Sequence, residues 1–222
     1  MTERKRLHLL VEGQTEFIVV QEVLGPHLFQ QGWTVTTSVV RTQTTSRTYR
    51  GGATSWTKIH RDIKELLGQT SLHVLTTLFD YYAFAEEAPG MTTRPSGSPQ
   101  ERVEHVENQL FRAVGDQRFV PNLVLHELES WVFAAGAELA ALRGEDDLAD
   151  TLERDCERAG GPELVNDGPS TSPSKRLEKY CPTYTKKIDG PLAIELLGVE
   201  QLSRRCPRFG AWLNRLDELR TN

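Results

Sequence analysis

Residues 6–16 read Arg-Leu-His-Leu-Leu-Val-Glu-Gly-Gln-Thr-Glu, and this stretch decides the fold. Its first six residues form a short apolar run that predicts a buried β-strand. Gly13 permits a tight turn directly after the strand, and Thr15 is a suitable N-cap for a helix over residues 16–31. Pro26 lies inside this helix and should kink or split it. The chain therefore opens with a strand, an acidic turn and a helix.

Strands and helices continue to alternate through the first part of the chain. Further strands are predicted at residues 34–41, 72–79 and 119–125, and helices at residues 56–67 and 101–114. This alternation predicts a parallel sheet with helices on both faces. Beyond it the pattern is helical, with helices expected at residues 128–142, 146–158, 173–180, 191–197 and 207–220.

These patterns predict an α/β protein with a four-stranded, parallel, Rossmann-like sheet flanked by helices and a helical C-terminal part. We expect an α/β core in residues 1–135 and a helical extension, packed on that core, in residues 136–222. The 222 residues are enough for a sizeable hydrophobic core.

Acidic side chains follow three of the four predicted strands. Glu12 and Asp80 follow the first and third, and Glu127 and Glu129 follow the fourth. Ligands of parallel α/β sheets bind beyond the carboxyl ends of the strands, so we expect these acids to meet at one edge of the sheet. Glu16, four residues after Glu12, is placed to face the same ion, to help bind a second ion or to orient a water. Carboxylates suit Mg²⁺ or Mn²⁺, and all five acids are predicted metal ligands.

Ordinary structural roles remain open for these acids. Glu16 also fits a helix N-terminal acid that complements the helix dipole, and Asp80 fits a turn-initiating residue. Glu127 and Glu129 are two positions apart and diverge on a helix, so only one of them is expected to reach the ion.

The net charge of −5 argues against a protein that coats nucleic acid by bulk charge, but basic residues gather in two stretches, 41–64 and 172–187. The second stretch begins with a predicted helix N-terminus at Ser172 or Ser174, which fits a phosphate contact or an ordinary capped surface helix. The predicted nucleic-acid contacts are Arg41, Arg47, Arg50, Lys58, Arg61, Lys175 and Arg176.

Cysteine spacing and hydropathy suggest a cytoplasmic location. The three cysteines are far apart and form no close pair, which argues against a zinc site and against a disulfide framework. No apolar run approaches the roughly 20 residues needed to cross a bilayer, so no membrane association is expected.

Several motifs carry a resemblance to a known family. Leu10-Val11-Glu12-Gly13 with Thr15-Glu16 resembles the opening motif of TOPRIM domains, the topoisomerase–primase catalytic fold, and is most similar to that of the overcoming-lysogenization-defect (OLD) nucleases. Later motifs resemble a TOPRIM-like bacterial family, domain of unknown function 4276. Those motifs are Leu78-Phe79-Asp80-Tyr81-Tyr82, His126-Glu127-Leu128-Glu129-Ser130-Trp131, Pro173-Ser174-Lys175-Arg176-Leu177 and Cys206-Pro207-Arg208-Phe209 with Trp212-Leu213.

The resemblance implies Mg²⁺-dependent cleavage or joining of nucleic acid, and an association with an ABC-type or AAA ATPase, often in phage defence. Glu12 would match the TOPRIM glutamate, a metal ligand or general acid/base. Asp80 would match the first Asp of the family's Asp-x-Asp motif. The second Asp position is Tyr82, so one metal ligand is missing unless Glu127 or Glu129 replaces it.

Three functions follow as hypotheses. The first is a Mg²⁺-dependent endonuclease with Glu12, Glu16, Asp80 and Lys175 as catalytic residues, Lys175 steadying the scissile phosphate. The second is a non-catalytic subunit that binds an ATPase or nucleic acid. The third is phosphoryl transfer or hydrolysis on a small nucleotide. DNA and RNA are both open as substrates, and so is assembly with further copies of the chain.

Overall fold

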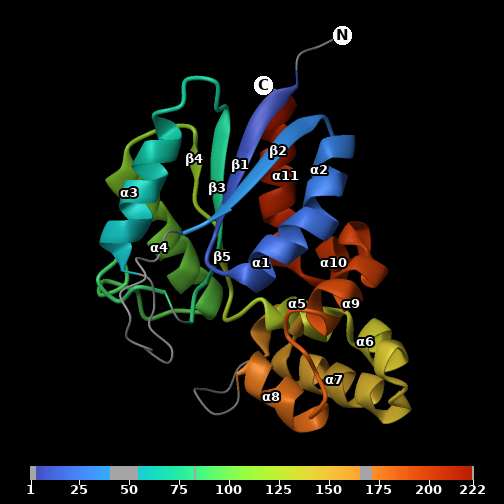
Figure 1. Cartoon of the computed structure of the whole chain (residues 1–222). Helices are drawn as coiled ribbons and strands as arrows, with labels where there is room; N and C mark the ends of the chain where they lie inside the picture. Colours follow the sequence, from blue (N-terminus) through green and yellow to red (C-terminus); the bar gives the residue numbers. More distant parts are fainter. Residues whose placement is uncertain (1–3, 41–54, 83, 166–171, 222) are drawn as a thin grey trace, which may run out of the picture.

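The computed structural model describes residues 4–40, 55–82, 84–165 and 172–221. Within them, parallel strands form one sheet in the order β2-β1-β3-β4, and β5 also pairs with β3 (Figure 1). Every strand pair is parallel, which confirms the predicted α/β class. The strands are β1 Lys5–Val11, β2 Trp33–Val39, β3 Val74–Asp80, β4 Phe119–Val120 and β5 Leu123–Val124.

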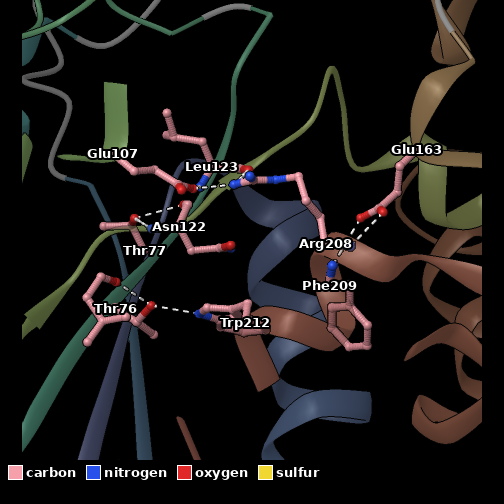
Figure 2. A network of polar contacts seen from close by, with 10 residues as sticks. Thr76, Thr77, Glu107, Asn122, Leu123, Glu163, Arg208, Phe209 and Trp212 are labelled. Carbon is pink, nitrogen blue, oxygen red and sulfur yellow. Dashed lines mark hydrogen bonds and ion pairs between the residues drawn. The ribbon is translucent and has the colours of Figure 1, made fainter. Parts of the chain in front are cut away.

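The predicted fourth strand is interrupted, and the described residues form five strands rather than four. Pro121 lies between β4 and β5, and proline has no N–H to donate to a strand ladder. The side chain of Thr77 on β3 bridges the gap. Its hydroxyl donates to the carbonyl of Asn122 and accepts from the N–H of Asn122, both at 2.9 Å (Figure 2).

The predicted first helix is three consecutive segments, α1 Gln14–Val19, the π-helical turn η1 Val20–Leu24 and α2 Gly25–Gln30. Pro26 lies in the first turn of α2 and explains the break, because it has no N–H and its ring excludes the carbonyl four residues earlier. The N-cap position belongs to Gly13. Thr15 lies inside α1 and is buried, so its predicted capping role is wrong.

Two layers of helices cover the sheet, as the alternation of side chains along β1 requires. Leu10 faces α3 Trp56–Leu67 and α4 Pro99–Val114 within one buried cluster. Leu9 and Val11 face the opposite way, toward α1, α2 and α11 Pro207–Thr221 (Figure 1).

The remaining helices lie beyond the carboxyl ends of the strands or beside α11 (Figure 1). The predicted helix at residues 128–142 breaks at Ala135 into two, and α10 was not predicted. The helical elements between β5 and α11 are α5 Glu129–Ala134, α6 Gly136–Arg143, α7 Asp146–Ala159, the 3₁₀ turn η2 Pro162–Leu164, α8 Pro173–Tyr180, α9 Asp189–Leu197 and α10 Val199–Arg205.

The last helix, α11, returns to the sheet and is held there by polar contacts (Figure 2). Trp212 Nε1 donates to the hydroxyl of Thr76 on β3 at 3.0 Å, and Arg208 forms an ion pair with Glu107 on α4. One buried apolar cluster contains residues of β1 and of α11 together.

The division of the chain into a core and a helical extension at residue 135 stays a prediction. No helix in the described ranges is both long and apolar enough to cross a membrane.

Candidate acidic site at the carboxyl ends of the strands

Glu12 and Asp80 lie at the carboxyl ends of two adjacent strands. Val11 and Leu78 are register partners in β1 and β3, so the residues after them emerge at the same edge. The carboxylate of Glu12 accepts a hydrogen bond from the N–H of Asp80 at 3.3 Å. The structure therefore brings together the two acids on which the predicted site depends.

Glu16 joins this pair from the first turn of α1. Its side chain is 5% exposed, and its negative charge raises the pKa of both Glu12 and Asp80. Gly13 leaves room for it, because a Cβ at Gly13 would stand 3.1 Å from Glu16 Oε2. The glycine of the opening motif thus permits the Glu16 carboxylate to fold back over the turn.

Glu129 approaches from α5, which follows β5 after a sharp turn. His126 forms this turn with a φ of 68°, a left-handed conformation that is uncommon for residues other than glycine. The carboxylate of Asp80 accepts the N–H of Leu128 at 2.9 Å and so fixes the start of α5 against β3. Glu129 is 1% exposed, and its charge raises the pKa of Asp80.

Lys186 faces this group of acids. Its Nζ lies 2.9 Å from Glu129 Oε1 and 3.1 Å from Oε2. Burial works against its charge, but the carboxylates of Glu129, Asp80 and Glu16 outweigh burial and raise its pKa. The sequence places Lys186 in a basic stretch, but no pattern there distinguishes it from its neighbours, so it was not among the predicted site residues.

Burial and mutual repulsion make the negative charges of these acids costly. Burial, followed by the charge of Glu16, raises the pKa of Glu12 to about 7. Burial, followed by the charges of Glu16 and Glu129, holds the pKa of Asp80 well above its usual range. Burial also raises the pKa of Glu129, although Lys186 opposes this. The arrangement favours any positive charge that can reach it.

Glu127 and Lys175 make their hydrogen bond and ion pair with residues of α8, and not with Glu12 or Asp80. The Glu127 carboxylate accepts the N–H of Ser174 at 2.9 Å and thereby holds the start of α8. Lys175 is exposed and forms an ion pair with Glu178 at 2.7 Å. Of the two acids after β5, Glu129 is the one whose charge acts on Asp80.

The predicted nucleic-acid contacts are scattered. Arg176 forms an ion pair with the buried Asp155 at 2.8 Å, which ties α8 to α7. Lys58 and Arg61 lie on α3, where Arg61 approaches Asp62 and Glu65. Three predicted contacts, Arg41, Arg47 and Arg50, lie outside the described residues.

The donor chemistry of the site fits a hard divalent cation, because Glu12, Glu16, Asp80 and Glu129 offer only carboxylate oxygens. The spacing is less favourable: within residues 4–40, 55–82, 84–165 and 172–221, no three His, Cys, Asp or Glu side chains are grouped closely enough to hold a metal ion. In the part of the chain that the structure describes, the ammonium group of Lys186 is a cation that these acids face.

A family model described as domain of unknown function DUF4276 matches residues 11–217. Among solved structures, the C-terminal region of the Burkholderia pseudomallei OLD protein is 15% identical, covering 97% of this chain and 98% of that one, with a TM-score of 0.42. No curated protein matches the chain.

Proposed function

This chain belongs to the DUF4276 family, and we propose that it is a Mg²⁺-dependent nuclease that cleaves phosphodiester bonds in DNA or RNA. The observation that carries the proposal is the meeting of Glu12 and Asp80 at one edge of the sheet, with Glu16 and Glu129 buried beside them. Several buried acids in one place are unfavourable without a cation, and a divalent ion supplies two positive charges.

Glu12 and Asp80 would hold the ion together with waters and a substrate phosphate, because Mg²⁺ at such sites usually has only one or two carboxylate ligands. Glu16 and Glu129 would lie beside this pair. When bound, Mg²⁺ or Mn²⁺ would polarise a phosphodiester and lower the pKa of a water. The protein side chains supply the rest. Without a bound ion the pKa of Glu12 is about 7, and a bound cation would lower it and keep the carboxylate ionised. Lys186, rather than the predicted Lys175, provides the positive charge next to the acids, and that charge would stabilise a phosphate there.

The test is cleavage of plasmid DNA and of RNA by the purified protein with Mg²⁺ or Mn²⁺, against a chelator. We expect Glu12→Gln and Asp80→Asn each to lower the cleavage rate by about 100-fold or more, as the loss of a transition-state contact does. Glu178→Gln is the matched control, because Glu178 is an exposed carboxylate that pairs with Lys175 on the surface of α8. Cleavage that survives in both site variants would end the proposal.

A specific observation supports a second candidate, a non-catalytic subunit that binds nucleic acid or an ABC-type ATPase. The side chain at the second acidic position of the motif is Tyr82, which is 43% exposed, and Glu129 is already paired with Lys186. Calorimetric titration with Mn²⁺ separates the two candidates, since a non-catalytic subunit would bind no ion.

Mononucleotides included in the cleavage assay would reveal the third candidate, a small-nucleotide hydrolase. A role in phage defence rests on the family resemblance.

A further inference from the structure

The connection between α8 and α9 carries a side chain into the acidic site. Residues 185–188 are exposed, yet the ammonium group of Lys186 reaches Glu129, whose side chain is only 1% exposed. The Lys186 side chain itself is 45% exposed. Lys186 therefore links the buried acids with solvent, and its four-carbon stem can swing outward without disturbing the core.

The turn that carries Lys186 is held in place by other residues. The N–H of Thr185 donates to the carboxylate of Asp189 at 2.6 Å, and the carbonyl of Thr185 accepts the N–H of Asp189 at 2.9 Å. Asp189 also forms an ion pair with Arg143 on α6 at 3.4 Å. The backbone is thus fixed whether or not Lys186 contacts Glu129, so the lysine side chain is a movable arm on a fixed base.

Lys186 satisfies Glu129 only in part. Its ammonium group donates to Oε2 at 3.1 Å and stands 2.9 Å from Oε1, but Oε1 is buried and accepts no well-directed hydrogen bond from the described residues. A carboxylate buried this deeply normally has its acceptor positions filled. The open acceptor marks a place that another donor, such as a water bound to an ion, can fill.

The charge of Lys186 also reaches the two acids that would hold the ion. It works to lower the pKa of Glu12 and of Asp80, and the charges of Asp80 and Glu16 in turn raise the pKa of Lys186. Lys186 and a divalent ion would therefore offset the same negative charges. Two cations held this close together repel each other, because a protein interior screens charge poorly.

We propose that Lys186 is the built-in counter-ion of the acidic site: its ammonium group takes the place of a cation beside Glu129 in the ion-free protein and leaves Glu129 when a divalent ion binds. The inference rests on the proposed function, because it concerns the same ion. Lys186 is then a positioning residue that sets the affinity of the site for the ion without contacting the ion itself.

The two contacts are coupled, and the coupling is the same in both directions. If Lys186 weakens binding of the ion, the ion weakens the contact between Lys186 and Glu129 by the same factor. Couplings between binding events are typically about 5- to 150-fold, so we expect a change of about 10-fold between neighbouring groups. One measurement tests each direction.

The first measurement is calorimetric titration of the full chain with Mn²⁺ alone. Lys186→Met keeps a long, unbranched side chain and removes its charge, so this variant should bind Mn²⁺ about 10-fold more tightly than the wild type. Lys187→Met is the matched control, because Lys187 is the next residue, carries the same charge and is exposed. The control should bind Mn²⁺ as the wild type does.

The second measurement needs no variant. Trace labelling of the wild type with acetic anhydride, followed by mass spectrometry, reports the reactivity of each lysine, since only a neutral and accessible amine reacts. Without ions Lys186 should react more slowly than Lys187, because the carboxylates around Lys186 keep it charged. Saturating Mn²⁺ should raise the labelling rate of Lys186 by about 10-fold and leave that of Lys187 unchanged.

Failure of the inference and failure of the proposed function give different results. If Mn²⁺ binds to none of the three proteins, both are wrong. If Mn²⁺ binds to the wild type but equally well or less well to Lys186→Met, the nuclease proposal stands and the inference is overturned. Labelling of Lys186 that Mn²⁺ leaves unchanged or slows would overturn it as well, and this result decides the matter if circular dichroism shows that Lys186→Met is not folded.

Discussion

At the scale of single residues, the acidic site is held together largely by backbone groups. The N–H of Asp80 donates to Glu12, and the N–H of Leu128 donates to Asp80. Lys186 is the cation that offsets the acids, through Glu129. Within the described residues, one lysine faces a group of several carboxylates, so the protonation of the site should depend strongly on pH.

The raised pKa of Glu12 predicts how stability changes with pH. Its pKa is about 7 in the folded protein against 4.5 ordinarily, so between these values the folded state binds more protons than the unfolded state. The free energy of unfolding should therefore fall as pH rises through this range, by on the order of 2 kcal/mol from Glu12. Urea denaturation at the two ends of the range, without divalent ions, measures it.

Glu12→Gln is the comparison for this experiment, since the amide does not titrate. The variant should lose less stability than the wild type over the same pH range, and added Mg²⁺ should stabilise it less at the upper end. An identical pH dependence in the two proteins would contradict the raised pKa.

Sequence reasoning could place Glu12 and Asp80 because their positions follow from parallel strands ending at one edge. It could not place Lys186, whose approach to Glu129 depends on how residues 181–188 connect α8 to α9. The same reasoning ranked Lys175 as the site cation, but Lys175 faces outward on α8 and meets its own neighbour Glu178.

At the scale of elements, α11 is anchored to the rest of the chain at its first turn. The carboxylate of Glu163, on η2, accepts the N–H of Arg208 at 2.9 Å and that of Phe209 at 3.1 Å. The side chain of Arg208 reaches Glu107 on α4 (Figure 2). Glu163 thus satisfies two donors at the start of α11 that the helix itself cannot pair.

Replacing Glu163 should destabilise the whole chain. Glu163 is 7% exposed, so Glu163→Ala leaves two poorly solvated N–H groups unpaired and should lower the free energy of unfolding by about 2–3 kcal/mol. Glu163→Gln keeps one oxygen acceptor and should cost less. Glu157→Ala, at an exposed position on α7, serves as the control for urea denaturation. Equal stability of the Ala variant and the control would contradict this role.

The elements that the sequence predicted poorly are a helix and a strand in which a proline interrupts the regular backbone hydrogen bonding. Pro26 was expected to kink or split the first helix, and the chain is divided there, but the π-helical turn before it was not predicted. Pro121 divides the fourth strand, yet Thr77 keeps both pieces beside β3. Helical periodicity predicted α8 at its observed bounds, because no such interruption affects it.

At the scale of the whole molecule, the helical part and the sheet share one buried cluster. It extends from Leu7, Leu9 and Val11 on β1 to Trp212 and Leu216 on α11. Hydrophobic spacing shows which face of a helix is buried, but not which distant element covers it. The return of α11 to the sheet therefore could not be predicted from the C-terminal pattern alone.

This shared cluster predicts that the chain unfolds in one cooperative step. Removing residues 136–222 would expose the β1 side chains that α11 covers, so residues 1–135 alone should lack a fixed tertiary structure. Unfolding in guanidinium, followed by far-ultraviolet circular dichroism and by tryptophan fluorescence, should give coincident curves, since Trp33 on β2, Trp131 on α5 and Trp212 on α11 lie in the same cluster. Two separate transitions, or a natively folded fragment 1–135, would instead show that the core and the helical extension are independent domains.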